Sequence, residues 1–296
     1  MPAPLLAVDA PSLLYRAFFA LPKSITDADD RPVNALLGTA NLLLQAVELH
    51  RPRAVVLCFG AEAATYRTAA YPPYHADRPP MPDELADQWA DAPAFFAAFG
   101  WPSLHAGDLE ADDLLGSLAA AERAAGGRAL LFTGDRDMFQ CVDDAVAVLF
   151  PGGRTGPALV EADEVRQRYG IDPAQVPDFI ALRGDPSDGL PGARGIGEKG
   201  AAELLRDHGT LERLIELAAD AGALARRTLK PRAAAALREQ ADELRSFRDI
   251  ATLRPIPVDR PPDAPLDAAG AAQAARARGM QRLAARVERM GPLSSS

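Results

Sequence analysis

The chain has 296 residues, of which 48% are hydrophobic and 25% charged; this supports a large core in one or two domains and excludes wholesale disorder. No apolar run approaches a membrane span of about 20 residues, and two cysteines are too few for a zinc site or a disulfide framework, so we expect a cytoplasmic protein. The net charge of −9 argues only mildly against a nucleic-acid partner, because a carboxylate-rich metal site lowers the total while a basic face survives elsewhere.

The start of the chain alternates short apolar runs with helical patterns. Residues 5–8 are typical of a buried strand, which ends at Asp9, and a helix is predicted over residues 13–20. A long amphipathic helix is predicted over residues 32–49, and a second buried strand over residues 54–59.

Residues 61–93 have a different composition. Tyrosine, arginine and proline alternate there and would pack poorly as a core. This indicates a protruding, partly helical excursion. Beyond it, an acidic segment opens a helix that Gly126-Gly127 ends, and strands are predicted over residues 129–133 and 145–150. Strands that alternate with helices predict an α/β fold, with a mostly parallel sheet covered by helices on both faces.

From residue 176 onward the strand patterns fade and helical patterns dominate. Helices are predicted over residues 176–183, 198–208 and 210–219, followed by a helical region to about residue 253, an extended linker over residues 255–265, a last helix over residues 273–290 and a frayed tail over residues 294–296. We therefore divide the chain into an α/β domain over residues 1–175, a helical domain over residues 176–255, and a linker, C-terminal helix and tail over residues 256–296.

Acidic side chains follow several of the predicted strands. Glu110, Asp112 and Asp113 stand together before an apolar helical pattern, and alone they would indicate only an acidic helix start. Asp9 follows the first strand, Asp135 and Asp137 follow a later one, and Asp185 and Asp188 lie in the helical part. Because the carboxyl ends of parallel strands meet at one edge, these acids should converge there. Such a cluster would need cations, and two Mg²⁺ or Mn²⁺ ions about 3.5–4 Å apart would suit phosphodiester hydrolysis.

Two further patterns indicate nucleic acid. Gly195 and Gly197 precede Lys199 and a helix, which fits a helix-hairpin-helix that grips a DNA backbone without reading sequence. A Walker phosphate loop is excluded because its spacing is absent. In the excursion, aromatic residues interleaved with cations suit stacking on single strands, but they equally suit side chains packed on a surface, and both interpretations stay open.

Together these motifs resemble the 5′-nuclease (flap endonuclease) family, and specifically the 5′–3′ exonuclease domain at the front of bacterial DNA polymerase I. The resemblance covers about residues 5–255. The matching motifs are Val8-Asp9, Tyr15-Arg16, Tyr66-Arg67, Tyr74-x-x-x-Arg78, Met81-Pro82, Glu110-Ala111-Asp112-Asp113, Thr133-Gly134-Asp135-Arg136-Asp137, Gly184-Asp185-x-Ser187-Asp188-x-Leu190-Pro191-Gly192 and Gly195-Ile196-Gly197-Glu198-Lys199. No polymerase-like segment follows, so we expect a stand-alone nuclease.

The resemblance implies a PIN-like α/β domain, a helical arch over residues 61–93, and a helix-three-turn-helix domain that binds duplex DNA with a K⁺ ion. It implies one Mg²⁺ or Mn²⁺ at Asp9, Glu110 and Asp112, with Asp113 close by, and a second at Asp135, Asp137, Asp185 and Asp188, with Asp112 near both. It implies catalytic roles for His75, Arg78, Asp112 and Asp135. It implies DNA contacts by Arg16, Tyr66, Arg67, Tyr74, Gly195, Gly197 and Lys199.

The sequence departs from the family pattern at two positions. Gly60 stands where the family usually has a first-site aspartate, and His75 stands where the arch usually has a lysine. His75 is a weaker base, because an imidazole with an ordinary pKa of about 6.5 is mostly neutral at pH 7. Water could take the vacant coordination position, as Mg²⁺ commonly keeps several waters. We therefore expect retained but altered activity.

Three functions are weighed. The leading one is a metal-dependent nuclease that removes 5′ flaps and short 5′ fragments from branched or nicked DNA in replication and repair, working near the nucleoid and by default as a monomer. The rival is a flap- or junction-binding protein that has lost hydrolysis at Gly60 and His75; the retained Asp135, Asp137 and Asp188 favour the enzyme. A single-strand RNase of the wider PIN group is disfavoured by the duplex-gripping motif at residues 195–199.

Overall fold

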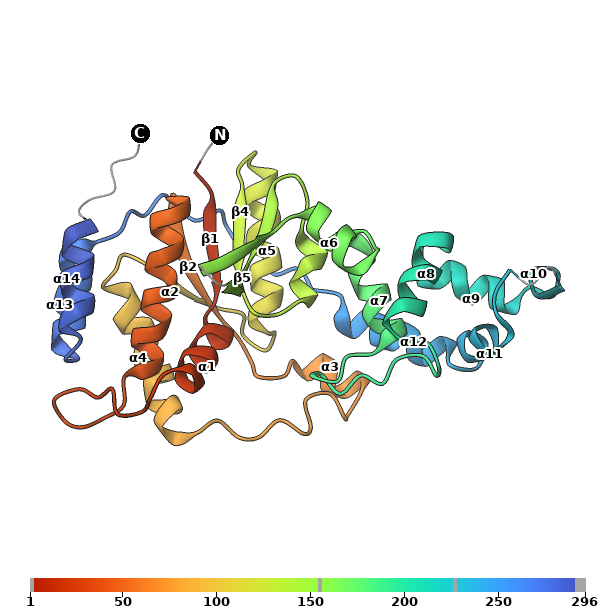
Figure 1. Cartoon of the computed structure of the whole chain (residues 1–296), viewed down its shortest axis with the longest axis horizontal. Coiled ribbons are helices and arrows are strands. Elements are labelled where there is room, and N and C mark those ends of the chain that lie inside the picture. The colour runs from red at the N-terminus through yellow and green to blue at the C-terminus, as the bar shows by residue number, and fades with distance from the viewer. Residues whose placement is uncertain (1–2, 154–155, 226–227, 291–296) are drawn as a thin grey trace.

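The computed structural model describes residues 3–153, 156–225 and 228–290, so the predicted tail over residues 294–296 lies outside the described part. Within these residues, six strands form one sheet in the order β3-β2-β1-β4-β5-β6 (Figure 1). The strands are β1 (Leu5–Asp9), β2 (Ala54–Phe59), β3 (Ser103–His105), β4 (Ala129–Phe132), β5 (Val146–Gly153) and β6 (Gly156–Val160). Neighbouring strands are parallel except for β5 and β6, which confirms the predicted α/β fold with a mostly parallel sheet.

The central strand β1 divides the hydrophobic core in two. Leu5 and Ala7 pack in one cluster, and Leu6 and Val8 pack in the other, because successive strand side chains point to opposite faces. All five residues of β1 are buried, as expected for a parallel strand covered on both sides.

Helices cover both faces of the sheet. The face of Leu6 and Val8 carries α1 (Ala10–Ala20), α2 (Asn34–His50) and α4 (Asp83–Ala97). The opposite face carries α5 (Ala111–Ala124), the 3₁₀ turn η1 (Asp137–Cys141) and α6 (Ala162–Tyr169). No helix in the described ranges is both long enough and apolar enough to cross a membrane.

The predicted excursion contains a short helix, α3 (Thr65–Ala70), a series of turns and most of α4. The part before α4, residues 61–82, is called the arch segment below. It runs along the lower edge of the molecule in Figure 1, on the same side as α1.

The second half of the chain extends to one end of the molecule as a helical layer (Figure 1). Its elements are η2 (Pro173–Gln175), α7 (Val176–Arg183), α8 (Glu198–His208), α9 (Leu211–Ala219), α10 (Ala221–Ala225), α11 (Pro231–Glu239) and α12 (Ala241–Ala251). Its buried side chains belong to the same cluster as those of α5, so one continuous core joins the helical layer to the sheet.

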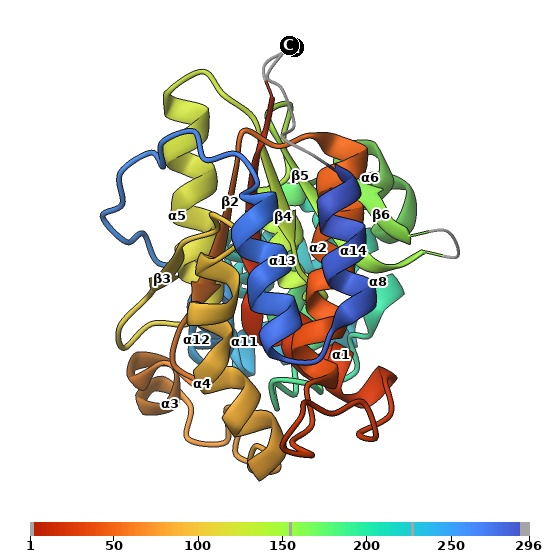
Figure 2. The same ribbon diagram turned by 90° about the vertical axis from the view of Figure 1, so that its left-hand side faces the viewer.

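After α12 the chain returns to the α/β part as an extended strap, residues 253–266, and ends in two helices, α13 (Ala268–Ala277) and α14 (Gln281–Met290). The expectation of a single helix over residues 273–290 is wrong, because Gly279 adopts a φ of +72° and turns the chain between them. Both helices pack in the core cluster of α2 and α4, and Figure 2 shows them beside those helices.

Candidate active site

The sheet reverses its strand order between β1 and β4. These strands are neighbours, although β2 and β3 lie on the far side of β1. At such a reversal a crevice opens outside the carboxyl ends of the strands. Asp9 closes β1 and Thr133 directly follows β4, and the Thr133 hydroxyl donates a 2.6 Å hydrogen bond to the Asp9 carboxylate. The two central strands are therefore joined at the edge where the acids are predicted to meet.

Asp9 is only 5% exposed and also caps α1, where its Oδ1 accepts a 3.0 Å hydrogen bond from the Ser12 N–H. Burial raises the pKa of Asp9, against the hydrogen bonds from Thr133 and Ser12 and the nearby positive charge of Arg78. Its carboxylate is thus fixed in orientation but costly to keep ionised.

Asp112, Asp135 and Asp137 share this environment. Burial raises the pKa of Asp112 well above its ordinary value, and the charges of Asp135 and Asp9 raise it further. Burial, followed by the charges of Asp135, Asp188 and Asp185, raises the pKa of Asp137 in the same way. The acids from β1, from α5, from the segment after β4 and from the helical layer therefore interact with one another.

The segment after β4 is held by its own polar groups. The Thr133 hydroxyl oxygen accepts a 3.0 Å hydrogen bond from the Asp135 N–H, and Asp135 Oδ1 accepts one of 2.8 Å from the Asp137 N–H. Two acids are thereby turned toward one side over a span of three residues.

Asp185 is held from two directions. Its Oδ1 accepts hydrogen bonds from the backbone N–H and the hydroxyl of Ser187, and its Oδ2 accepts one of 3.1 Å from Arg183 Nη2. Burial and the neighbouring acids raise the pKa of Asp137 overall, and the positive charge of Arg183 partly opposes them. Sequence reasoning missed Arg183 and Thr133; their signal was adjacency, since each lies within two residues of an acid of a predicted metal-site motif.

The donor set suits a hard divalent cation, because it consists of carboxylate oxygens whose mutual repulsion and burial a cation would relieve. Among the described residues, however, no three acidic, histidine or cysteine side chains already surround one point as metal ligands do. The residues therefore match a divalent cation in the type and proximity of their donor atoms. The carboxylates would turn inward around bound ions.

Two of the predicted metal ligands are engaged in a separate network. Arg67 forms ion pairs of 2.8 Å with Glu110 and 3.1 Å with Asp113, and its Nε donates to the Ile250 carbonyl at 3.0 Å. Asp113 is fully buried, and its oxygens also accept hydrogen bonds from the Arg254 and Glu110 N–H groups. The described partners of Asp113 are thus an arginine and two backbone N–H groups, and its place beside a metal site stays a prediction.

Glu110 belongs to the same network. Its oxygens accept hydrogen bonds from the Ala64 N–H at 2.7 Å and from the Tyr74 hydroxyl at 3.1 Å. Its charge still acts on Asp112, so its place at a metal site stays a prediction.

The predicted DNA contacts by Arg67, Tyr74 and Tyr66 are not supported by their surroundings. Arg67 is 3% exposed and Tyr74 is 5% exposed, so neither can reach a nucleic-acid strand. The Tyr66 ring is half-buried, with the Arg254 guanidinium 3.3 Å and the Arg67 guanidinium 5.2 Å from its centroid. Tyr66, Arg67 and Tyr74 instead belong to a buried network of ion pairs and ring contacts, which is closer to the packing interpretation than to stacking on DNA.

His75 and Arg78 instead bring the arch segment to the acid cluster. His75 Nε2 lies 3.0 Å from Asp188 Oδ1, and Arg78 Nη2 lies 3.1 Å from the same oxygen. The His75 backbone adopts a φ of +56° and its ring stacks on Tyr74 at a centroid distance of 3.8 Å. Arg78 remains half-exposed, so its guanidinium is also accessible to a ligand.

Gly60 proves to be a point of close backbone approach. A Cβ at this position would lie 2.5 Å from the backbone N of Ala111 and 2.5 Å from the carbonyl carbon of Glu110. A side chain here would displace the start of α5, so glycine at this position also serves the packing of α5 on the end of β2.

The predicted DNA-gripping loop is open to solvent. Gly195, Gly197 and Lys199 are exposed, and added Cβ atoms at the two glycines would meet nothing within 4 Å. The loop leads into α8, whose first backbone N–H groups have no side-chain cap. Arg16, the remaining predicted DNA contact, is exposed on α1.

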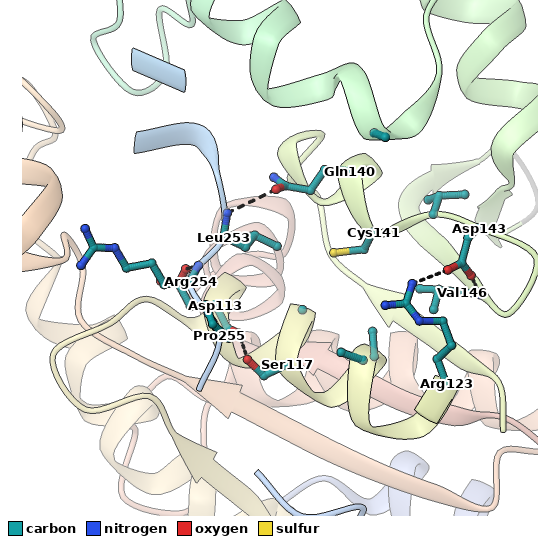
Figure 3. Close-up of a pocket in the computed structure, with 15 residues that line it drawn as sticks. Asp113, Ser117, Arg123, Gln140, Cys141, Asp143, Val146, Leu253, Arg254 and Pro255 are labelled. Atoms are coloured by element: carbon teal, nitrogen blue, oxygen red, sulfur yellow. Dashed lines mark hydrogen bonds and ion pairs between the residues drawn. The ribbon is translucent and has the colours of Figure 1, made fainter. Parts of the chain in front are cut away.

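A pocket of about 390 Å³ lies behind α5, away from these acids (Figure 3). It is bounded by α5, by the segment around Cys141 and by the strap, which Asp113 and Gln140 anchor through the N–H groups of Arg254 and Leu253. Asp113 is the one predicted site residue in its described lining, so this pocket is not the predicted active site.

Two family models match consecutive parts of the chain. The N-terminal, resolvase-like domain of 5′-3′ exonucleases matches residues 4–170, and the C-terminal SAM fold of 5′-3′ exonucleases matches residues 171–271. The chain belongs to the 5′-3′ exonuclease family. This confirms the family resemblance that its motifs indicate.

Curated relatives of this 5′-3′ exonuclease family chain are DNA polymerases I. The thermostable DNA polymerase I of Thermus thermophilus is 41% identical over 211 residues, covering 71% of this chain and 25% of that protein. DNA polymerase I of Chloroflexus aurantiacus is 38% identical over 270 residues, covering 90% of this chain and 27% of that protein. The chain thus spans about a quarter of the length of these relatives.

Solved structures show the same fold for this chain. The bacteriophage T5 D15 flap endonuclease in a pseudo-enzyme-product complex with DNA and metal ions superposes with a TM-score of 0.66 at 17% identity, over 97% of both chains. The catalytic core of Rad2 in complex with DNA substrate gives a TM-score of 0.62 at 16% identity, over 96% of this chain and 91% of that one.

The raised carboxyl pKa values predict how the stability of the metal-free chain depends on pH. Burial raises the pKa of Asp135 from 3.8 to about 7, helped by the charges of Asp188 and Asp9, so between these values the folded state holds a proton that the unfolded state releases. The free energy of unfolding should therefore fall as the pH rises through this window. Denaturant unfolding in a chelator at pH 5 and pH 8 measures the fall.

Asp135→Asn provides the comparison, because an amide does not titrate. Its free energy of unfolding should fall less between the two pH values than that of the wild type. Equal falls in the two proteins would contradict the assignment of the raised pKa to Asp135.

Proposed function

We propose that this chain hydrolyses DNA phosphodiesters at 5′ ends and branched junctions, as a 5′–3′ exonuclease and 5′-flap endonuclease of replication and repair. Its substrate would be DNA with a 5′ flap, a nick or a free 5′ end, at the nucleoid in the cytoplasm. The observation that carries the proposal is that the charges of Asp9, Asp112 and Asp135 act on one another, although the three acids come from separate elements of a family-typical fold.

Carboxylates of this cluster would hold two divalent ions, Mg²⁺ or Mn²⁺. Asp9 and Asp112, with Glu110 near them, would hold the first. Asp135, Asp137, Asp185 and Asp188 would hold the second. When bound, such ions activate a water molecule and stabilise the charge that develops on the phosphate.

The arch segment would position the phosphate. Arg78 pairs with Asp188 at the cluster and is half-exposed, so a phosphate oxygen could replace that carboxylate as its partner. His75 shares the same Asp188 oxygen and could donate a hydrogen bond to the phosphate once Asp188 turns away. Both side chains would thereby move from an acid of the cluster to the substrate.

The open loop at residues 195–199 would bind the duplex beside the cleavage point. Its exposed backbone allows close approach of a DNA phosphate, and Lys199 adds a positive charge. A K⁺ ion held at this loop would add positive charge beside the DNA backbone and is part of the proposal.

A flap- or junction-binding protein without hydrolysis is the second candidate, because His75 replaces the usual lysine. It is less favoured, since Asp135, Asp137 and Asp188 interact in one cluster. The single-strand RNase alternative is disfavoured by the exposed loop at residues 195–199.

A 5′-labelled flap duplex incubated with the full chain and Mg²⁺ or Mn²⁺ tests the proposal. We expect release of the flap and short 5′ fragments with either metal and none in a chelator. Binding without cleavage under both metals would favour the second candidate.

Lys199→Ala should weaken duplex binding irrespective of sequence. Each phosphate contact contributes a slope of about −0.9 to the dependence of log K on log salt, so loss of one contact should flatten the slope by about that amount. Titration of a flap-free duplex at several salt concentrations measures it. Arg289→Ala is the control, because this exposed cation lies on α14 at the opposite end of the molecule. An unchanged slope in Lys199→Ala would remove the lysine from the interface.

A further inference from the structure

The side chain of Phe19 is exposed to solvent although it is large and apolar. Its exposed fraction is 71%, and the other exposed large apolar side chains in the described part of the chain are Leu49 and Leu159. A single exposed apolar residue needs no explanation by itself. The position of Phe19 relative to the acid cluster, however, points to a function for the exposed ring.

Phe19 lies on α1, the helix that starts at Asp9 in the cluster. It is one turn beyond Tyr15, on the same face of the helix, because residues four apart are neighbours there. The two rings stack with centroids 6.4 Å apart and an angle of 29° between their planes. At 1.5 Å per residue, Phe19 is about 15 Å from Asp9 along the helix axis.

The inner end of this pair lies near charged side chains of the arch segment. Burial raises the pKa of the Tyr15 hydroxyl, and the charges of Glu62 and Arg78, both in the arch segment, are near enough to act on it as well. The Tyr15 ring is fixed by edge contact with Trp89 at 6.3 Å. The aromatic pair therefore leads along α1 from the side of the acid cluster and the arch segment to the outer end of the helix.

Phe19 is itself held in place from behind. The Phe18 ring meets it edge-on at 5.2 Å, and Lys23 lies 5.0 Å from the Phe18 centroid. Lys23 is itself paired with Glu84 at 3.1 Å, whereas Arg16 is exposed three residues before Phe19 on the same helix. The sequence predicted such a mixture of exposed aromatic and cationic groups for the arch segment. There, however, the aromatic rings are buried or half-buried.

We propose that Phe19 forms a stacking subsite for a base of the unpaired 5′ strand that extends from the acid cluster. The chemistry favours single-stranded nucleic acid, because bases stack on an exposed ring while flanking cations bind the backbone. About four to five stacked nucleotides at 3.4 Å each span the estimated 15 Å from Asp9. The proposal rests on the proposed function, which identifies the bound strand as a 5′ flap. It adds that Phe19 favours substrates with a long single-stranded 5′ end.

The test measures affinity rather than cleavage, so that it stays informative if the chain hydrolyses nothing. Fluorescence anisotropy in a chelator compares duplexes that carry 5′ flaps of one to ten nucleotides, with the full-length wild type, Phe19→Ala, Phe19→Leu and Phe19→Trp. We expect Phe19→Ala to weaken binding of the longest flap by about tenfold, in the range of one base–aromatic stack. The loss should grow with flap length and reach its full size at about five nucleotides.

The substitutions separate stacking from apolar contact and from charge. Phe19→Trp should retain the affinity of the wild type and Phe19→Leu should lose it. The slope of log K against log salt should not change in Phe19→Ala, because a ring releases no counterions, whereas it should flatten in Arg16→Ala. Leu49→Ala is the matched control, since Leu49 is 66% exposed at the end of α2, next to the opposite edge of the sheet.

Phe19→Ala and wild type with equal affinity at all flap lengths would overturn the proposal, as would Phe19→Leu behaving like wild type. Failure of the wild type to cleave any flap would contradict the proposed function instead. The dependence of binding affinity on flap length would still show whether Phe19 stacks on a base.

Discussion

Asp135→Ala should lower the rate of flap cleavage by at least about a hundredfold. Metal ions supply several kcal/mol of transition-state stabilisation in such sites, and each 1.36 kcal/mol corresponds to a factor of ten in rate. Asp135 is the acid on which the cluster centres, because it interacts with Asp9, Asp188 and Asp185 and holds the N–H of Asp137. Its loss should therefore weaken the second metal site and disturb the turn that presents Asp137. Single-turnover cleavage of a labelled flap duplex at saturating enzyme measures the rate.

DNA binding separates this effect from a general loss of structure. Affinity for the flap duplex in a chelator should stay near that of the wild type or increase, because a negative charge near the phosphates is removed. Asp144→Ala is the matched control, since Asp144 is exposed just before β5, at the opposite edge of the sheet. A cleavage rate within threefold of wild type in Asp135→Ala would remove Asp135 from the reaction, and equal losses of cleavage and binding would assign it a structural role.

The convergence of the acids was predictable because it follows from topology alone. Parallel strands end at one edge, so an acid after β1 and another after β4 must come near each other whatever lies between them. Asp9 and Asp135 are 126 positions apart in the sequence, yet the pairing of β1 with β4 brings them into one environment. Local pattern and a general rule were sufficient here.

The interior of the arch segment was not predictable in the same way. A tyrosine beside an arginine has the same sequence pattern whether it faces DNA or a buried carboxylate. What decides between them is the contact of Arg67 with the Ile250 carbonyl, which lies 183 positions further along the chain. No local signal reports such a partner, so both interpretations of this segment were equally consistent with the sequence.

Gly60 shows how a missing side chain can mislead. Compared with the family pattern it suggested a lost metal ligand, but the backbone of Glu110 and Ala111 occupies the space a Cβ would need. Glycine therefore permits the start of α5 to pack on the end of β2. The substitution has changed local packing along with donor chemistry, and an aspartate restored at this position would have to move the helix that carries Asp112.

Arg67→Met should destabilise the fold by about 3–5 kcal/mol, the usual effect of removing one partner from a buried ion pair. The substitution preserves much of the volume but leaves Glu110 and Asp113 buried without their shared cation, and it frees the Ile250 carbonyl. Because Arg67 connects the arch segment with α5 and with the end of α12, the variant should also loosen the contact between the helical layer and the sheet. Denaturant unfolding followed by circular dichroism gives the free energy.

The pH dependence of the variant identifies the cause. Burial raises the pKa of Asp113 and the charge of Arg67 lowers it, so without Arg67 that pKa should rise further and the destabilisation should shrink as the pH is lowered toward 5. Arg123→Met is the matched control, because Arg123 pairs with Asp143 at 57% side-chain exposure, where such pairs contribute at most about 1 kcal/mol (Figure 3). If Arg67→Met lost no more stability than Arg123→Met, or lost the same amount at every pH, Arg67 could not be the cation that stabilises the buried carboxylate of Asp113.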